Sequence, residues 1–274
     1  MKRILSVVMA LSLAMGFTTG CAAGKKVNVG RTAASLFISD EQEAQLGKQV
    51  KQELETKEKI KYVEDPAVVE YVNTVAKPIL QAANRDRANV KWKLHVIDDP
   101  KMVNAFATPG GYLYVYTGLL LAADNEAELA GVLGHEAAHV TGRHSAQALM
   151  LQYGQEALIG VALGKNPGTA AQIAASLAGT GTGLAFSRGN ETEADELGAK
   201  YTSAAGYDPR GLVSFFQKLA SAESKTPGFM KWLSTHPPSA DRVQHLNSYI
   251  AKNNLTGSNV GTDRLAAIKA ILKK

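Results

Sequence analysis

The stretch Asn125–His144 reads NEAELAGVLGHEAAHVTGRH and carries most of the information about this chain. Its apolar residues recur at helical spacing, and Asp124 or Asn125 is a suitable N-cap. The pattern predicts a buried helix that runs on toward Tyr153. The histidines inside this helix need polar partners, because unpaired polar groups are costly in an apolar environment.

His135, Glu136 and His139 have the spacing of a zinc site. Residues four apart lie on the same face of a helix, so two imidazole nitrogens can point at one centre. Two such nitrogens supply half of a tetrahedral zinc site. Glu136 flanks this face and can take a proton from a water molecule there, as in the HExxH metalloproteases. A chance occurrence is the alternative, expected in roughly one protein per few hundred.

His144 is not expected to be the third ligand. On a continuous helix its side chain would point about 140° away from that of His139. A structural histidine, bonded to the backbone or to a carboxylate, is the favoured interpretation. His95 and His245 lie outside any motif and are interpreted in the same way.

Residues 187–198, SRGNETEADELG, are expected to form a helix that supplies the third ligand. An anionic oxygen would complete a site with two neutral histidines and offset the charge of the metal. Glu191 and Asp195 are four residues apart, so one can ligate while the other accepts the outward N–H of a ligand histidine or pairs with an arginine. Alternatively, these acids, with Glu193 and Glu196, only complement the helix dipole.

His236 lies in LSTHPPSADR, residues 233–242, where two prolines restrict the backbone after it. The functional interpretation is a side chain directed into the cleft, where it stabilises an oxyanion. The alternative is an ordinary loop histidine beside the start of a helix.

Several helix starts are predicted from capping residues. Ser39 and Gln42 match a capping box, and the helix that follows should reach about Lys57. Asp65 precedes a second helix, and Asn190 is the expected N-cap of the acidic helix.

A small sheet is expected between the second helix and the histidine helix. VKWKLHVID, residues 90–98, alternates as a strand does. Pro109 and Gly110 suit the centre of a type II turn, so the flanking segments should form a hairpin with Val103–Thr108 as its edge arm. Residues 154–186 are rich in Ala, Gly and Thr, and a soluble helical hairpin packed close to the site is favoured over membrane insertion.

The N-terminus has the features of a secretory signal, with Lys2 and Arg3 before an apolar run. TTGC, ending at Cys21, resembles a lipobox, although Thr18 stands where leucine is usual. A lipoprotein cleaved before Cys21 and anchored on the periplasmic side of the outer membrane is therefore expected. The alternatives are a chance cysteine and a soluble periplasmic protein.

The composition excludes some function classes. The 274 residues are 45% hydrophobic, enough for a substantial core, and the single cysteine precludes an internal disulfide. The net charge of +5 includes Lys2 and Arg3 and is too small to indicate nucleic-acid binding.

Four motifs together resemble the zinc metallopeptidase family that includes HtpX and the CaaX prenyl proteases, most closely its exported bacterial members of the BepA and LoiP type. They are VNAFATPGG, GHEAAHVTGRH, SRGNETEAD and STHPPSADR, and the resemblance spans roughly residues 38–250. It implies one zinc ion held by His135, His139 and Glu191, with Glu136 as general base and acid. No transmembrane helix is expected, which disfavours prenylated substrates.

The resemblance implies further roles. Asp195 would support a ligand, and Arg242 would pair with Asp195 or help at the oxyanion. His236 would stabilise the tetrahedral intermediate or cap the zinc in a latent form. A polypeptide substrate would add a strand to the edge arm. The residues expected to bind it are Asn104, Ala105, Phe106 and Ala107.

These inferences predict an α+β, mainly helical zincin-like domain with a small sheet. The expected divisions are a signal peptide (1–20), a lipid-anchored tether (21–38), the metallopeptidase domain (39–251) and a linker with a basic amphipathic tail (252–274), which docks or is disordered. The expected function is hydrolysis of misfolded or misassembled envelope proteins, with the outer-membrane assembly machinery as a candidate partner. The alternatives are a chaperone with a largely latent zinc site and a zinc amidase acting on cell-wall peptides.

Overall fold

The computed structural model describes residues 38–181, 184, 186–222, 232, 235–236 and 240–273. The predicted signal peptide and Cys21 lie outside the described residues. The fold is α+β and mainly helical with one small sheet, as predicted. The elements are α2 (Asp40–Thr56), α3 (Pro66–Ala83), β1 (Lys93–Ile97), β2 (Ala105–Thr108), β3 (Tyr112–Tyr116), α4 (Thr117–Ala122), α5 (Glu126–Thr141), α6 (His144–Tyr153), α7 (Gln155–Ala162), α8 (Pro167–Ala178), α9 (Arg188–Ala204), α10 (Gly211–Ala222), α12 (Ala240–Lys252) and α13 (Thr262–Leu272).

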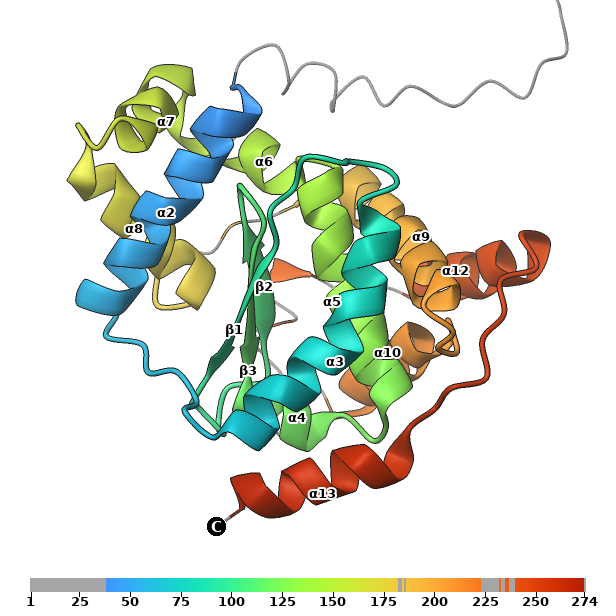
Figure 1. Ribbon diagram of the computed structural model, residues 1–274. Coiled ribbons are helices and arrows are strands. Elements are labelled where there is room, and N and C mark those ends of the chain that lie inside the picture. Colours follow the sequence, from blue (N-terminus) through green and yellow to red (C-terminus); the bar gives the residue numbers. More distant parts are fainter. Residues whose placement is uncertain are drawn as a thin grey trace, which may run out of the picture.

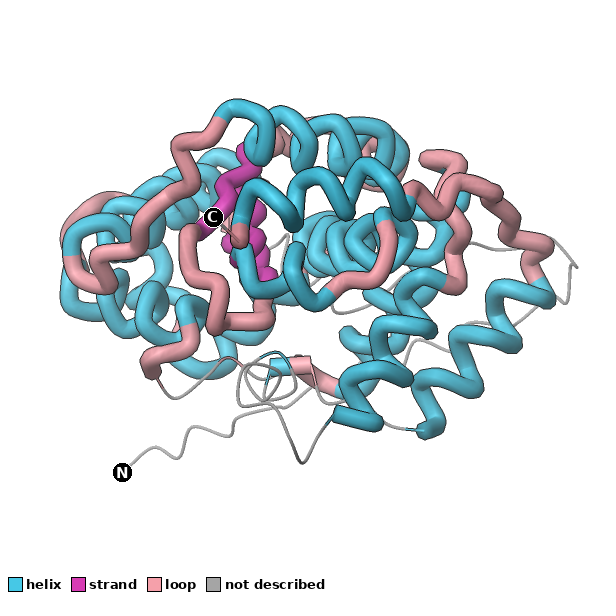
Figure 2. The backbone as a smooth tube through the Cα atoms, turned by 90° about the horizontal axis from the view of Figure 1, so that it is seen from below, coloured by secondary structure: helices cyan, strands magenta, loops and turns pink. Residues whose placement is uncertain are grey.

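The sheet separates two hydrophobic clusters. Its order is β1-β3-β2, with β1 parallel and β2 antiparallel to β3. Leu113 and Val115 of β3 belong to one cluster, and the tyrosines that alternate with them belong to the other. Figure 1 shows α3 and α5 beside one face and α2, α7 and α8 beside the other. Figure 2 shows the strands enclosed between helices on both sides, which explains why all five residues of β3 are buried.

The predicted hairpin and most predicted caps are confirmed. Gly110 has a φ of +83°, as the turn requires, and β2 is an edge strand of the sheet. The Ser39–Gln42 capping box is present, and Asp65 and Asn125 cap α3 and α5. The prediction for α9 was wrong by three residues, because the side chain of Ser187 accepts from the Asn190 N–H and starts the helix earlier.

The helix of the HExxH motif does not continue to Tyr153. It ends at Thr141, and a separate helix, α6, begins at His144. Between them Arg143 has a φ of +58°, in the left-handed region that non-glycine residues rarely adopt. The Arg143 side chain is held there, because its Nε donates to Glu43 of α2 at 2.5 Å and its Nη2 donates to the Ile38 carbonyl at 2.7 Å.

The flanking helices pack on this core. α7 and α8 form the predicted helical hairpin, but it lies against α2, on the face of the sheet opposite α5, and reaches β2 beside the site through α8. α13 docks on α3, α4 and α5, with Leu265 and Ile268 buried and Arg264 paired to Glu126 at 2.5 Å. Docking is thus the outcome for the basic tail. In the part of the chain that the structure describes, every helix is too short or too polar to cross a bilayer.

Candidate metal centre

Helix α5 supplies three of the predicted site residues from one buried turn. The Nε2 atoms of His135 and His139 lie 3.0 Å apart, as the four-residue spacing predicted. Glu136 is on the same helix and is 2% exposed. Close packing with α9 positions this turn, because a side chain on Gly198 would overlap the backbone of His135.

Helix α9 places its two key carboxylates on different sides of the histidines. Glu191 Oε1 is 3.4 Å from His139 Nε2, and Glu191 Oε2 is 3.6 Å from His135 Nε2, so this carboxylate faces the centre. Asp195 Oδ1 lies 3.0 Å from His135 Nδ1, on the outer side of the ring. Glu191 thus faces the point between the two histidines, whereas Asp195 lies behind His135, a difference that the residue spacing alone left open.

His236 joins this group from a distant part of the chain. Its Nδ1 is 3.0 Å from Glu191 Oε1 and 3.2 Å from His135 Nε2, and its Nε2 is 3.4 Å from Glu136 Oε1. The Trp232 ring stacks on it with the centroids 4.9 Å apart. His236 is thus a buried member of the site rather than an ordinary loop histidine.

Arg242 binds the carboxylates of α9. Its Nε and Nη2 each donate to Asp195 at 2.8 Å, and its Nη1 lies 2.8 Å from Glu191 Oε2. This arrangement matches the first of the two roles that the resemblance implied for Arg242, pairing with Asp195. The guanidinium holds both carboxylates in place and offsets their charge.

The chemistry of the donor set fits a metal cation. One ligand atom from each of His135, His139, Glu191 and His236 can be chosen so that all lie within 4.8 Å of one another. Burial lowers the pKa values of His135 and His139, which favours neutral rings. Their outward Nδ1 atoms face Asp195 and His144, so the protons belong there and the two Nε2 lone pairs face each other at 3.0 Å. A cation between them removes this repulsion.

The carboxylates next to the histidines differ in protonation. Burial alone would raise the pKa of Glu191, but His236 and the other histidines hold it well below its ordinary range, so Glu191 is an anion. Burial raises the pKa of Glu136 to about 7, with Glu191 adding to the effect and His236 and the Ala107 N–H opposing it. A carboxylate with a pKa near neutrality can both accept and return a proton.

The edge strand β2 runs beside α5, and its outward backbone groups are only partly free. The Tyr116 N–H donates to the Asn104 carbonyl, so the backbone N–H and C=O groups of Asn104 and Phe106 point toward β3. Those of Ala105 and Ala107 point away from it. The Ala107 N–H is close enough to Glu136 to lower the pKa of its carboxyl group, and the Ala107 carbonyl accepts from Ser145 Oγ at 3.2 Å. The predicted substrate edge is therefore reduced to Ala105, which is itself only 1% exposed, because Ala107 is already bonded within the protein.

A comparison with known protein families identifies the chain. The model of peptidase family M48 matches residues 66–250, which include every residue of the metal centre. The chain belongs to peptidase family M48. Elements outside the family M48 match pack against it, since α2 binds Arg143 and α13 docks on α5.

Relatives in family M48 include eukaryotic and bacterial peptidases. Mitochondrial metalloendopeptidase OMA1 of Schizosaccharomyces pombe is 34% identical over 180 residues, which cover 66% of this chain and 52% of the relative. The beta-barrel assembly-enhancing protease of Yersinia pestis is 33% identical over 216 residues, covering 75% and 43%. That of Escherichia coli is 30% identical over 223 residues, covering 77% and 44%. The chain spans about half the length of the curated relatives it matches.

Two aromatic residues of the M48 site carried no recognisable signal in the sequence. The Phe186 ring lies 4.0 Å from that of His139 and 5.3 Å from that of His236, between centroids. The Trp232 ring lies 5.9 Å from that of His135 and 4.9 Å from that of His236, between centroids. A single aromatic residue has no spacing pattern, so only the fold reveals that these two enclose the histidines.

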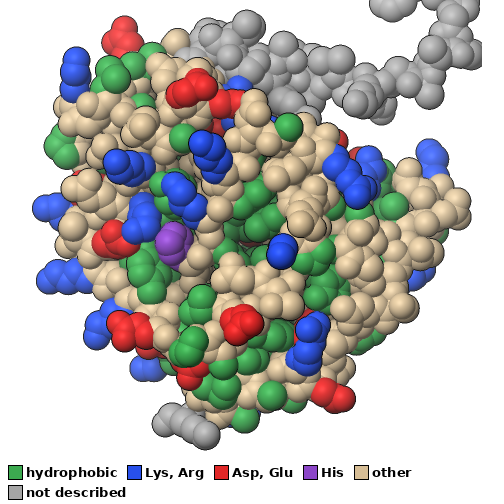
Figure 3. Space-filling view, in the orientation of Figure 1, with side chains coloured by type: hydrophobic (Ala, Val, Ile, Leu, Met, Phe, Trp, Pro, Cys, Tyr) green, Lys and Arg blue, Asp and Glu red, His purple; other side chains and the backbone are tan. Residues whose placement is uncertain are grey.

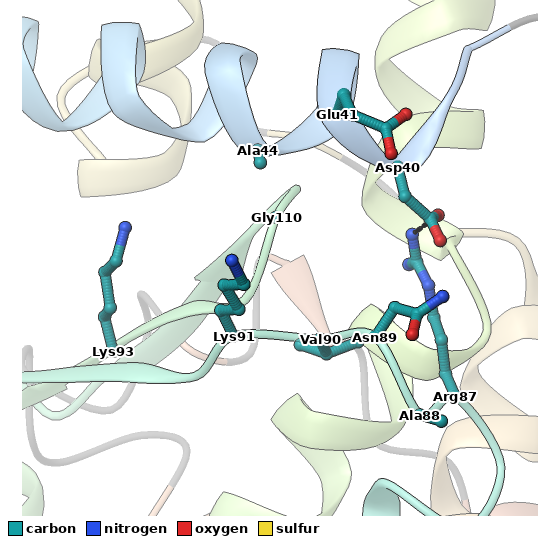
Figure 4. A pocket seen from close by; sticks show the side chains of 10 residues that line it. All are labelled: Asp40, Glu41, Ala44, Arg87, Ala88, Asn89, Val90, Lys91, Lys93 and Gly110. Atoms are coloured by element: carbon teal, nitrogen blue, oxygen red, sulfur yellow. Dashed lines mark hydrogen bonds and ion pairs between the residues drawn. The ribbon is translucent and has the colours of Figure 1, made fainter.

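A separate cavity of about 490 Å³ lies away from the M48 metal group. Figure 4 shows it between the start of α2, the segment before β1 and the turn at Gly110, with Lys91 and Lys93 directed toward α2. Its lining contains none of the four metal-group residues. Figure 3 shows basic and acidic side chains interspersed over this face of the molecule, around a hollow that contains hydrophobic side chains.

Proposed function

We propose that the protein is a zinc-dependent endopeptidase of the bacterial cell envelope. The observation that carries this proposal is the convergence of the His135 and His139 Nε2 atoms, 3.0 Å apart, beside the anionic Glu191 and next to Glu136. His135, His139 and Glu191 would hold the ion, and two nitrogens with one carboxylate are a common zinc ligand set in hydrolytic enzymes. Zinc, when bound, supplies Lewis-acid chemistry that acidifies a water molecule and polarises a carbonyl.

The side chains around the ion perform the proton transfers and the positioning. Glu136 accepts a proton from the attacking water and delivers it to the leaving amine, a dual role that a pKa near 7 supports. Asp195 and Arg242 fix the orientation of His135 and Glu191. Ala105 on the edge strand offers backbone groups to an extended peptide, so the substrate is a polypeptide bound by strand addition.

We place the protein on the periplasmic side of the outer membrane. Residues 1–20 would be removed as a signal peptide, Cys21 would carry the lipid, and residues 21–38 would form the tether. Residues 39–251 would form the peptidase domain. A soluble periplasmic form is the alternative. The substrates would be misfolded or misassembled envelope proteins, which the name of the bacterial relatives, beta-barrel assembly-enhancing protease, supports.

A second candidate function is an envelope chaperone or assembly factor with a largely latent site. The position of His236 favours it, because His236 Nδ1 lies 3.2 Å from His135 Nε2 and would take the coordination position that a substrate needs. In this form His236 caps the ion. The two candidates differ in whether removal of Glu136 abolishes the biological effect.

Cleavage of casein by the purified protein and its Glu136→Gln variant tests the proposal. We expect cleavage by the wild type and a loss of at least about 100-fold in the variant with zinc retained, because a general base contributes about 10²–10⁴ to the rate. His245→Gln, which changes an exposed pair on α12 and α9, is the matched control and should cleave normally. If Glu136→Gln still rescues every phenotype of a deletion strain, the chaperone function is favoured instead.

A further inference from the structure

The third histidine of GHEAAHVTGRH lies directly behind the second. His144 Nδ1 is 3.2 Å from His139 Nδ1, and His144 Nε2 is 3.2 Å from Glu193 Oε2. The side chain of His144 is fully buried, whereas that of Glu193 is 23% exposed. Both ring nitrogens of His144 thus have polar neighbours, one at the metal group and one near the surface.

The hydrogen-bond direction along this chain follows from the position of His139. Its Nε2 faces the centre of the site, 3.0 Å from His135 Nε2, so a ligand lone pair on Nε2 requires the proton on Nδ1. The His139 Nδ1–H then donates to His144 Nδ1, and the proton of His144 lies on Nε2 and is donated to Glu193. The carboxylate can only accept, so it fixes the direction of both hydrogen bonds.

The backbone is built to hold His144 in this place. A continuous helix would carry it away from His139, but the left-handed Arg143 turns the chain back between α5 and α6. Arg143 is anchored by Glu43 and the Ile38 carbonyl. A side chain at Gly142 would overlap the His144 ring, so the glycine provides the space that the ring occupies.

The two ligand histidines have different supports. His135 contacts Asp195, whose charge is offset by Arg242. His139 has no direct carboxylate on its outer nitrogen in the described residues, and His144 conveys the effect of Glu193 to it. Outer partners of this kind set the tautomer and basicity of a ligand histidine.

We propose that His144, oriented by Glu193, is a positioning residue that fixes the tautomer and ring orientation of His139 for metal binding. This inference rests on the proposed function, because it requires His139 to be a metal ligand. It goes beyond a packing role, since a packing histidine needs neither acceptor nor donor. The metal site depends on the lone pair of His144 Nδ1, which accepts the hydrogen bond from the Nδ1–H of His139.

Zinc dissociation constants of the full chain, measured by competition with a chromophoric chelator, test this proposal. His144→Phe keeps a ring of similar size but has no acceptor, and we expect it to weaken zinc binding by about 10- to 100-fold. His144→Asn keeps an oxygen near the position of Nδ1, and we expect it to recover most of the affinity. His245→Phe alters the exposed 2.8 Å pair between His245 of α12 and Glu196 of α9, and this variant should bind zinc as the wild type does.

A second pair of variants decides the question where His144→Phe does not fold. Glu193→Ala removes the partly exposed end of the chain, and we expect weaker zinc binding than in the matched Glu196→Ala. Wild-type affinity in both His144→Phe and Glu193→Ala would overturn the proposal, as would equal losses in His144→Phe and His144→Asn. A wild type that binds no zinc would instead contradict the proposed function.

Discussion

Arg242 donates two hydrogen bonds of 2.8 Å to Asp195, and Asp195 lies 3.0 Å from the outer nitrogen of His135. The orientation of the His135 ring is thus set by an ion pair between α9 and α12. Since Arg242 also reaches Glu191, one guanidinium supports two members of the metal group.

Arg242→Met should destabilise the protein strongly. The substitution leaves two buried carboxylates without their cation, which costs about 3–5 kcal/mol in the free energy of unfolding. Urea denaturation of the metal-free protein measures this loss. Lys51→Met removes the exposed pair with Glu55 and should change stability by less than about 1 kcal/mol. Equal effects of the two substitutions would show that the Arg242 ion pair is not important for stability.

Glu136 should make the stability of the metal-free protein depend on pH. Its folded pKa of about 7 lies above the ordinary 4.5, so between these values the folded state binds more protons than the unfolded state. The contribution of Glu136 to the free energy of unfolding therefore falls as pH rises through this window, by about 3 kcal/mol at pH 8.

Glu136→Gln removes this titration. We expect the variant to match the wild type at about pH 4 and to be more stable by about 3 kcal/mol at pH 8, in urea denaturation with a chelator present. An exposed change, Glu196→Gln, serves as the control. Parallel pH profiles of the wild type and Glu136→Gln would contradict the raised pKa.

His236→Ala should raise casein cleavage several-fold if His236 caps the ion. The reason is that His236 Nδ1 lies 3.2 Å from His135 Nε2, in the place that a bound substrate would otherwise occupy. Initial rates at saturating zinc measure the change, with His245→Ala as the control. A fall of about 100-fold or more would assign His236 to oxyanion stabilisation instead.

Ala105→Pro should raise KM with little change in kcat. Proline removes the outward N–H of the edge strand and breaks no hydrogen bond to β3, because the Ala105 N–H points away from that strand. The lost hydrogen bond is worth about 1 kcal/mol, or roughly a fivefold increase in KM. Ala105→Ser keeps the N–H and is the control. An unchanged KM in the proline variant would mean that substrates do not add a strand at β2.

Local signals in the sequence predicted much of this fold. The capping box at Ser39, the glycine turn at Gly110 and the metal-binding face of α5 each depend on residues close together in the chain. Such features follow from backbone preferences and helical periodicity, so they could be identified without the structure.

Long-range contacts explain what the sequence did not predict. The parallel pairing of β1 with β3 depends on packing across the whole domain. The break after Thr141 was missed because arginine rarely adopts a positive φ, and it is Glu43, far away in the chain, that holds Arg143 there. The sequence predicted a structural role for His144 but not its contact with His139, because only the break in the helix brings the two side chains together.

Anomalous diffraction from crystals of the protein, collected on both sides of the zinc absorption edge, tests the central claim most directly. We expect one zinc peak, bonded to the Nε2 atoms of His135 and His139 and to a carboxylate oxygen of Glu191. A zinc-replete crystal with no peak there, or with its peak on other residues, would contradict it.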